Sequence, residues 1–384
     1  MTHRRLPVFL VSLLEQMMLL GGRHWWLSIV FWLVWIAPAL ALELRVAIHE
    51  GKSQLQVGSS TKALVRDATG QEVGELAALN GYKADSKQGN VALGQWRSQT
   101  LWIEPTDGGY TWIGDRWYRG RTQLVIASKG LTAVNHVDLE HYLYSVLGAE
   151  MSPSWPLEAL KAQAVAARSY ALHKSSRGGN SVYDVGNTTA WQVYKGLESE
   201  APSTRQAVQE TAGQVMTYNG QIILAAFHAA SGGHTENVED IWKSSFIPYL
   251  RGVVDYDKGA PVYEWTKSFS HNELSRKISG VGKVISMTPE RTTPQGRIVT
   301  MIVKGESGTK RVSGSDLRSA LGLRSTLFVV NSTGSGFNIS GRGYGHGIGM
   351  SQWGARNLAA QGVNYQQILS HYYPNATLSQ LQGN

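Results

Sequence analysis

The chain has no cysteine among its 384 residues. Disulfide bonds, thiolate nucleophiles and cysteine-ligated zinc sites are therefore excluded. The G-x-S-x-G motif that carries the nucleophile of many serine hydrolases is also missing, so we do not expect a serine hydrolase. A fixed-period repeat and a low-complexity linker are absent too. With 42% hydrophobic residues, a chain of this length has to rely on a sizeable hydrophobic core and is long enough to build one.

Charged residues are few, and basic residues outnumber acidic ones. Charged residues make up 17% of the chain, and the formal net charge is +8. A mildly basic protein suits an anionic surface such as a cell wall or a membrane. No basic tract or nucleic-acid motif accompanies this charge, so we expect no nucleic-acid partner.

The N-terminus carries a long stretch without charge, from Trp25 to Leu42, which follows Arg23. Ala39-Leu40-Ala41 has the small-x-small form of a cleavage site, so we interpret residues 1–41 as a secretory signal peptide. The alternative is an uncleaved membrane anchor over residues 25–42, near the shortest length that spans a bilayer. Met17 would give a more ordinary signal peptide than Met1. We expect a secreted or periplasmic protein associated with the cell wall.

The pattern of apolar, polar and turn-forming residues after the signal peptide predicts an α+β fold. Alternating apolar and polar residues between turn signals predict short strands to about residue 130. An alanine-rich helix is predicted over 153–176, a second helix over 201–213, and strands over 214–230. Residues 270–280 predict a helix and 296–314 a hairpin. We divide the chain into a β-rich region (42–130), a core (131–254) and a C-terminal α+β part (255–384), with the alanine-rich helix beside a cleft and the subdomains around a groove.

Glu150 is the first candidate catalytic residue. It follows the apolar run Leu143 to Ala149, and a carboxyl group in such surroundings has a raised pKa, as a general acid requires. The alternative is a glutamate that caps the next helix or pairs with Lys161 or Arg168. Those two cations lie seven residues apart on the alanine-rich helix, so they point nearly the same way and could lie in a narrow groove.

Two glycine-rich stretches are the other candidates. His228 leads into Ser231-Gly232-Gly233, a turn that exposes backbone amides, and His234 follows. Two histidines at this spacing also suggest a metal, but the substrate-contacting turn is the better interpretation. In "GRGYGHGIGMSQWGA" (341–355), glycine alternates with other residues around Tyr344 and His346, which suggests either a tight connection or a ligand lying against bare backbone.

Six segments together resemble one family. They are "AEMSPSWPLEALKAQAVAARSYAL", "YDVGNTTAWQVYKG", "HAASGGHTE", "PYLRGV", "LRSTLF" and "GRGYGHGIGMSQWGA". In this order they are similar to the SpoIID/LytB family of stage II sporulation protein D and amidase enhancers, over roughly residues 130–384. The resemblance implies a protein directed at peptidoglycan, with Glu150 as the acid and base of a lytic transglycosylase. It implies substrate contacts at the matching polar and glycine positions, which are Lys161, Gln163, Arg168, Gln192, Ser231, Gly232, Gly233, Thr235, Glu236, Tyr344, His346 and Gln352.

The sequence departs from the family pattern in two places. Ser152 separates the Glu-Met pair from Pro153, although the glutamate is retained. Some members of the family bind zinc through a histidine and two cysteines, and here Gly186 and Trp191 stand at the cysteine positions. His173 is either the remaining ligand of that site or simply a histidine at the end of a helix. We therefore expect no metal and no other cofactor.

One glutamate suffices for a lytic transglycosylase. Ordinary glycosidases need two carboxyl groups, of which one acts on water or the anomeric carbon. In a lytic transglycosylase the 6-hydroxyl of the muramic sugar replaces that water and leaves a 1,6-anhydro end. The alternative, from a different class, is a non-catalytic wall-binding factor that stimulates an N-acetylmuramoyl-L-alanine amidase. A hydrolase acting with water is a third interpretation.

Overall fold

The computed structural model describes residues 42–381, apart from residues 179 and 243. The predicted signal peptide therefore lies outside the described residues. Within them, 24% of the chain is helical and 39% is strand, in several sheets and eight helices, which confirms the α+β class. No helix in this range is long and apolar enough to cross a membrane.

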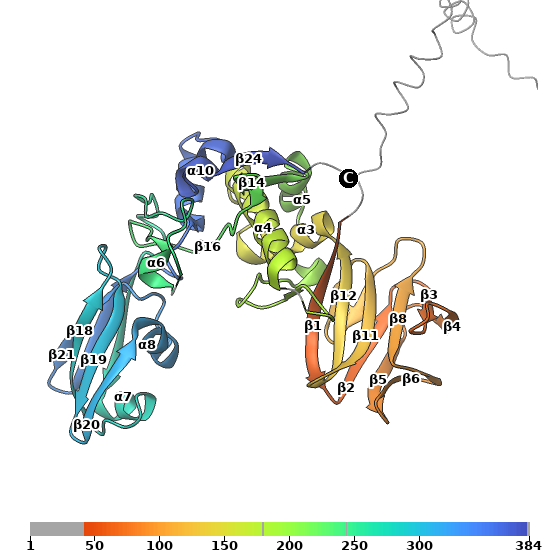
Figure 1. The fold of residues 1–384 in the computed structure, drawn as a ribbon, viewed down its shortest axis with the longest axis horizontal. Coiled ribbons are helices and arrows are strands. Elements are labelled where there is room, and N and C mark those ends of the chain that lie inside the picture. The colour runs from red at the N-terminus through yellow and green to blue at the C-terminus, as the bar shows by residue number, and fades with distance from the viewer. Residues whose placement is uncertain (1–41, 179, 243, 382–384) are drawn as a thin grey trace, which may run out of the picture. The chain divides into compact units, whose positions relative to one another are not determined.

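The first part of the chain forms two sheets, as the alternating pattern predicts (Figure 1). In order, the seven-stranded sheet contains β13 (Val185–Gly186), β1 (Glu43–Lys52), β12 (Gly130–Asp138), β11 (Arg121–Ala127), β8 (Thr100–Pro105), β3 (Ala63–Arg66) and β4 (Glu72–Leu76). The six-stranded sheet contains β10 (Arg116–Tyr118), β9 (Thr111–Ile113), β2 (Gln54–Ser59), β5 (Gly81–Lys87), β6 (Asn90–Leu93) and β7 (Trp96–Ser98). Alternate residues of both sheets are buried in one core, which is typical of two sheets packed face to face.

The second part is built around the alanine-rich helix α4 (Leu157–Gly178). Its alanines from Ala159 to Ala171 are completely buried, and their small side chains let other elements approach closely. The elements that contact α4 are α3 (Leu139–Glu150), α5 (Pro202–Glu210), α9 (Gln352–Ala360), α10 (Tyr365–Tyr372) and the strands β13, β14 (Gln214–Tyr218) and β15 (Gln221–Ile222). The smaller elements of this part are η1 (Gly196–Ser199), β16 (Phe227–His228), α6 (Val238–Ile241), β23 (Met350–Ser351) and β24 (Thr377–Gln380).

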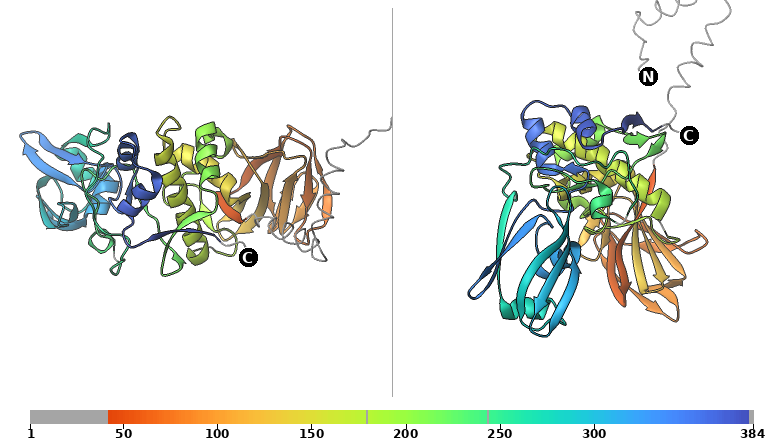
Figure 2. Two further views of the ribbon diagram at one scale, coloured as in Figure 1. Left: turned by 90° about the horizontal axis from the view of Figure 1, so that it is seen from above. Right: turned by 60° about the vertical axis from the view of Figure 1, so that its left-hand side comes forward.

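The third part has a hydrophobic core of its own, from Trp265 to Ile339. Two three-stranded antiparallel sheets enclose it, in the orders β17-β22-β21 and β18-β19-β20, and Figure 2 shows these strands in the cyan and blue part of the ribbon. The elements are β17 (Glu264–Ser270), α7 (His271–Lys277), β18 (Val284–Thr292), β19 (Ile298–Gly305), β20 (Gly308–Ser313), α8 (Gly314–Leu321), β21 (Phe328–Thr333) and β22 (Gly336–Arg342). We call residues 264–342 the C-terminal module.

This division differs from the boundary drawn from the sequence. The segment from Ile348 to Tyr373 does not join the core of the C-terminal module but the core that contains α3 and α4. The parallel pairing of β16 with β23 explains this return, because it brings Met350 opposite Phe227. The module is therefore an insertion between two halves of one core.

Candidate functional site

Glu150 is the last residue of α3, and its half-buried carboxylate is held by two donors. The backbone N–H of Val193 donates to Oε1 at 2.9 Å, and Nε2 of Gln352 donates to Oε2 at 3.4 Å. Burial raises the pKa of Glu150, although both hydrogen bonds act in the opposite direction. Within the described residues the carboxylate has no ion pair with Lys161, Arg168 or any other cation, which removes the ion-pair alternative.

Gln352 reaches Glu150 because of its place at the start of α9. Ser351 caps this helix, and its hydroxyl accepts the N–H of Gly354 at 3.1 Å. The first side chain of the helix is thereby fixed, and Gln352 is almost fully buried. The structure thus brings two of the predicted site residues together, although 202 positions separate them in the sequence.

Gln192 supports the segment that carries Val193. Its Oε1 accepts a hydrogen bond from the Tyr142 hydroxyl at 3.2 Å, and its Nε2 donates to the carbonyl of Ala167 at 3.2 Å. Gln192 is buried, so the structure gives it a positioning role in place of the predicted glycan contact. Tyr170, on α4, is also affected by the Glu150 charge. Burial is the larger cause and the charge of Glu150 the smaller cause that together raise the pKa of Tyr170 to about 12.

The predicted cationic groove is not formed. Arg168 is completely buried, and its guanidinium contacts both carboxylate oxygens of Glu140, at 2.8 and 2.6 Å. Lys161 forms ion pairs with Glu158 at 2.9 Å and Glu210 at 2.6 Å. Carboxylates of α3, α4 and α5 thus neutralise both cations. Both therefore hold helices together and take no part in the group around Glu150.

Gln163 is also completely buried in α4. Neither Oε1 nor Nε2 has a hydrogen-bond partner among the described residues. A side chain without exposed surface cannot contact a glycan directly, so the contact predicted for it is not made.

The amides of the Ser-Gly-Gly turn are already occupied. Asp257 accepts the N–H groups of Gly232 and Gly233 at 2.7 and 2.9 Å, and Asp255 accepts the Ser231 hydroxyl at 2.5 Å. Burial and the neighbouring charge of Asp255 raise the pKa of Asp257 to about 6. This turn is therefore closed by two aspartates rather than open to a sugar. The sequence reasoning missed them, although "VVDYD" places two acids two residues apart after an apolar pair.

Glu236 belongs to a buried network with the C-terminal module. The side-chain atom Oε1 of Glu236 accepts a hydrogen bond from the Thr293 hydroxyl at 2.6 Å and lies 3.7 Å from Nε of Arg297. The backbone N–H of Glu236 donates to the carbonyl of Gly347 at 2.7 Å. Thr235 is buried beside it, and its hydroxyl accepts a backbone N–H. Arg297 is completely buried, and burial lowers its pKa to about 10. Glu236 is thus a structural carboxylate, not a second one available to substrate.

His346 is fixed as a neutral imidazole. The N–H of Ile348 donates to Nδ1 at 3.1 Å, so the proton is on Nε2, which donates to the carbonyl of Phe227 at 2.9 Å. Burial lowers its pKa to about 4. Both ring nitrogens are used, so the ring has no free group for a ligand. Tyr344, by contrast, is 45% exposed.

The comparisons with known proteins decide the family. A model described as "Stage II sporulation protein" matches residues 127–218, and a model described as a domain of unknown function matches residues 255–349. The chain is 34% identical over 273 residues to stage II sporulation protein D of Bacillus subtilis (strain 168), covering 65% of this chain and 76% of that protein. The chain belongs to the SpoIID family.

Two further relatives are similar to this chain. An uncharacterized protein of Brachyspira hyodysenteriae is 36% identical over 282 residues, which cover 70% of this chain and 73% of that protein. The amidase enhancer of Bacillus subtilis is 35% identical over 292 residues, which cover 62% of this chain but 40% of that protein. The match to the sporulation-protein model ends before the Ser-Gly-Gly turn, and it contains Glu150 and the whole of α4.

Gly186 and Trp191, which the resemblance places at two positions of the zinc site of some SpoIID members, cannot bind a metal through their side chains. A Cβ on Gly186 would lie 2.9 Å from the Trp191 ring, so the indole fills this space. His173 contacts the carbonyl of Ile222 through Nδ1 at 3.0 Å. Across residues 42–381 with their two gaps, no three histidine, aspartate or glutamate side chains cluster closely enough to hold a metal ion. The residues present therefore do not fit such a centre.

Proposed function

We propose that this protein is a peptidoglycan lytic transglycosylase in which Glu150 is both acid and base. The observation that supports the proposal is the environment of the Glu150 carboxyl group. It is half-buried, it has no cation within ion-pairing distance among the described residues, and two neutral donors orient it. Burial favours the protonated form that a general acid needs.

The two partners differ in what they do with the proton. The Val193 N–H can only donate, so Oε1 remains an acceptor whatever the charge of the group. The amide of Gln352 carries both a donor and an acceptor, so after a rotation of its terminal group it can accept from a protonated Oε2. We therefore place the transferable proton on Oε2.

The reaction then needs no second carboxylate. Oε2 gives its proton to the glycosidic oxygen as the bond from that oxygen to the anomeric carbon of the muramic sugar breaks. The 6-hydroxyl of the same sugar attacks the anomeric carbon, and Oε2 takes the proton of that hydroxyl. The products are a free 4-hydroxyl and a 1,6-anhydro end, and Glu150 returns to its starting state without consumption of water.

The test is mass spectrometry of products from purified glycan strands. The wild-type chain should release anhydro ends, and Glu150→Gln should release none while keeping its fold. Glu158→Gln, on the neighbouring helix, is the matched control and should keep turnover. Anhydro products from Glu150→Gln would refute the mechanism, and reducing ends from the wild type would indicate a hydrolase.

The similarity to the amidase enhancer favours a second candidate, a non-catalytic factor that stimulates a cell-wall amidase. This role requires wall binding but no proton transfer. Glu150→Gln and the wild type should then stimulate an added N-acetylmuramoyl-L-alanine amidase equally, and neither should produce anhydro ends. Both candidates act on the wall outside the cytoplasm, in agreement with the predicted signal peptide.

A further inference from the structure

Two tryptophans form an aromatic pair next to Glu150. Trp155 lies in the loop that follows α3, and Trp353 is the second residue of α9. Their ring centres are 4.7 Å apart, their planes are inclined by 60°, and both side chains are partly exposed. The loop and the helix thus meet twice, at the hydrogen bond of Gln352 with Glu150 and at this aromatic pair. The indoles therefore adjoin the carboxyl group of Glu150.

A cation lies on the same side of α9. Arg356 is four residues after Gln352 and three after Trp353, so its side chain projects near both of theirs. Its Cζ is 5.6 Å from the centre of the Trp353 ring, a distance typical of a cation–π contact. Arg356 is also partly exposed. A molecule that contacts the aromatic pair can therefore reach the guanidinium as well.

The charge of Arg356 is not neutralised by the fold. Within residues 42–381, apart from the two gaps, no carboxylate lies within ion-pairing distance of it, in contrast to Lys161 and Arg168. Nη1 donates to the neutral Oδ1 of Asn357 at 2.9 Å, and Nε is shielded from solvent without an acceptor. A buried donor without a partner costs free energy, so the stability of the fold does not explain this placement. Nη2 has no acceptor among the same residues and remains for a ligand.

A glycan strand of peptidoglycan supplies one group for this cation. Its sugars alternate between N-acetylglucosamine and N-acetylmuramic acid, and both rings have an apolar face that packs on an indole. The muramic ring alone bears a lactyl group, which ends in a carboxylate where no peptide is attached. This is the only charged group of a bare strand, and it is attached directly to the ring. An arginine beside the aromatic pair is therefore suited to hold the carboxylate of a ring that lies on the indoles.

The reaction proposed for Glu150 needs such a contact. Both kinds of sugar have a 6-hydroxyl group and an anomeric carbon, yet the reaction takes place at the muramic sugar alone. The two donors that orient Glu150, the Val193 N–H and the Gln352 amide, contact the carboxyl group itself and do not distinguish the sugars. A cation at a fixed distance from Glu150 does distinguish them, because the carboxylates recur at every second sugar.

We propose that Trp155, Trp353 and Arg356 form a muramic-acid subsite beside Glu150. The indoles hold the sugar ring, and Arg356 holds its lactyl carboxylate and so fixes the register of the strand. The inference rests on the proposed function, because it takes the glycan strand of peptidoglycan as the ligand of the chain.

Isothermal titration of the full chain tests this, with Glu150→Gln present throughout so that the probes are not cleaved. The probes are a peptide-free tetrasaccharide of peptidoglycan, the same tetrasaccharide with its carboxylates methylated, and a tetramer of N-acetylglucosamine. The probe with free carboxylates should bind about tenfold to a hundredfold more tightly than the other two, the range of a hydrogen bond to a charged group. Adding Arg356→Gln should remove this preference, Arg356→Lys should keep part of it, and Trp353→Leu should weaken the binding of all three probes.

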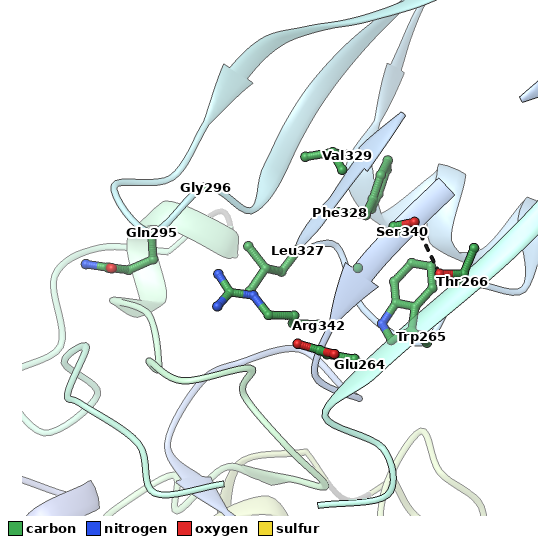
Figure 3. Close-up of a pocket in the computed structure, with 11 residues that line it drawn as sticks. Glu264, Trp265, Thr266, Gln295, Gly296, Leu327, Phe328, Val329, Ser340 and Arg342 are labelled. Carbon is green, nitrogen blue, oxygen red and sulfur yellow. Dashed lines mark hydrogen bonds between the residues drawn. The ribbon is translucent and has the colours of Figure 1, made fainter. Parts of the chain in front are cut away.

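Arg342→Gln is the matched control. Arg342 is an exposed arginine without an ion pair in the part of the chain that the structure describes, and it lines a cavity of about 660 Å³ in the C-terminal module that Glu150 does not line. Figure 3 shows its guanidinium pointing toward Gln295. This variant should keep the preference for free carboxylates, and urea unfolding of each variant shows whether the fold is retained.

Four results would overturn the subsite. They are equal affinity for the free and the methylated probe, an Arg356→Gln variant that keeps the preference, an Arg342→Gln variant that loses it to the same extent, and a Trp353→Leu variant that binds every probe normally. The first of these comparisons uses the chain with both arginines in place, so it does not depend on the folding of an arginine variant.

Failure of the subsite differs from failure of the proposed function. If the preference depends on Arg356 but the wild-type chain releases no anhydro ends, the subsite stands and Glu150 is not catalytic. If anhydro ends depend on Glu150 but the preference is absent, only the subsite is wrong. In an active chain, Arg356→Gln should raise KM for the peptide-free strand about tenfold or more, with a smaller change in kcat, and should leave KM for the methylated strand unchanged. A purely structural role of Arg356 would change both KM values alike.

Discussion

Gly347 offers the sharpest test of how the glycine-rich loop works. Its φ is +82°, in the left-handed region that side chains rarely adopt, and a Cβ there would overlap the buried guanidinium of Arg297. The loop therefore needs glycine for packing, since Arg297 occupies the space where a side chain would lie. Gly347→Ala should unfold or severely destabilise the chain rather than merely block a ligand.

The expected size follows from two contributions. Placing alanine in the left-handed region costs about 1–2 kcal/mol. Displacing Arg297 breaks its buried pairing with Glu236, and removing one partner of such a pair costs about 3–5 kcal/mol. The total of about 4–7 kcal/mol approaches the entire stability of an ordinary domain, about 5–15 kcal/mol.

Urea unfolding of a matched pair separates the two contributions. Gly362 has a φ of +87°, and a Cβ added there would meet nothing within 4 Å, so Gly362→Ala should show only the backbone cost of about 1–2 kcal/mol. The double variant Gly347→Ala with Arg297→Ala should cost less than the sum of the single changes, because the second change removes the clash. If Gly347→Ala were no worse than Gly362→Ala, the packing argument would be refuted.

Three further predictions concern the charged groups. Arg168→Met should lower the free energy of unfolding by about 1–3 kcal/mol, because Glu140 and the carbonyls of Gln214 and Val208 lose their charged hydrogen-bond donor. The folded fraction should bind glycan as the wild type does in a pull-down with purified walls. The pKa of Asp257 is raised to about 6, so folding favours its protonated form. The free energy of unfolding, measured by urea denaturation, should therefore fall as the pH rises from about 4 to above 6. Asp257→Asn should make this free energy less dependent on pH. Because burial raises the pKa of Glu150, the rate of anhydro-end release should decline as pH rises through that pKa, and a flat or rising rate would contradict its role as an acid.

Local patterns predicted most of the regular structure. The alternating strands before residue 130, the helices at 157–178, 202–210 and 271–277, and the hairpin of β19 and β20 all lie where propensity and turn residues place them. Helix α3 was missed, because residues 142–147 are aliphatic or aromatic except for Ser145, so the segment shows no clear helical spacing of apolar and polar positions. Its start carried a usable signal, since the side chain of Asp138 accepts the N–H of His141 as a helix cap does.

The site was harder to predict than the fold. Glu150 was identified from its apolar surroundings, and Gln352 from its motif, but nothing local says that the two meet. Asp255, Asp257 and Arg297 were missed, because their partners lie on other elements, 24 to 66 positions away. A sequence pattern gives the direction of a side chain on its own element, whereas burial and pairing depend on what the fold brings opposite it.

The two cations of α4 show why this matters for function. Their spacing correctly put Lys161 and Arg168 on one side of the helix, and a groove for an anionic glycan was a reasonable interpretation of two unneutralised charges. Glu140 and Glu210 neutralise them from other helices, at 2.6 Å in each case. Arg342 shows the opposite case: it is exposed, no carboxylate in the described residues pairs with it, and no spacing rule singled it out. Which charges are available to a ligand is therefore known only after the structure has shown which charges the fold itself pairs, and on that ground neither cation of the alanine-rich helix is a candidate ligand contact.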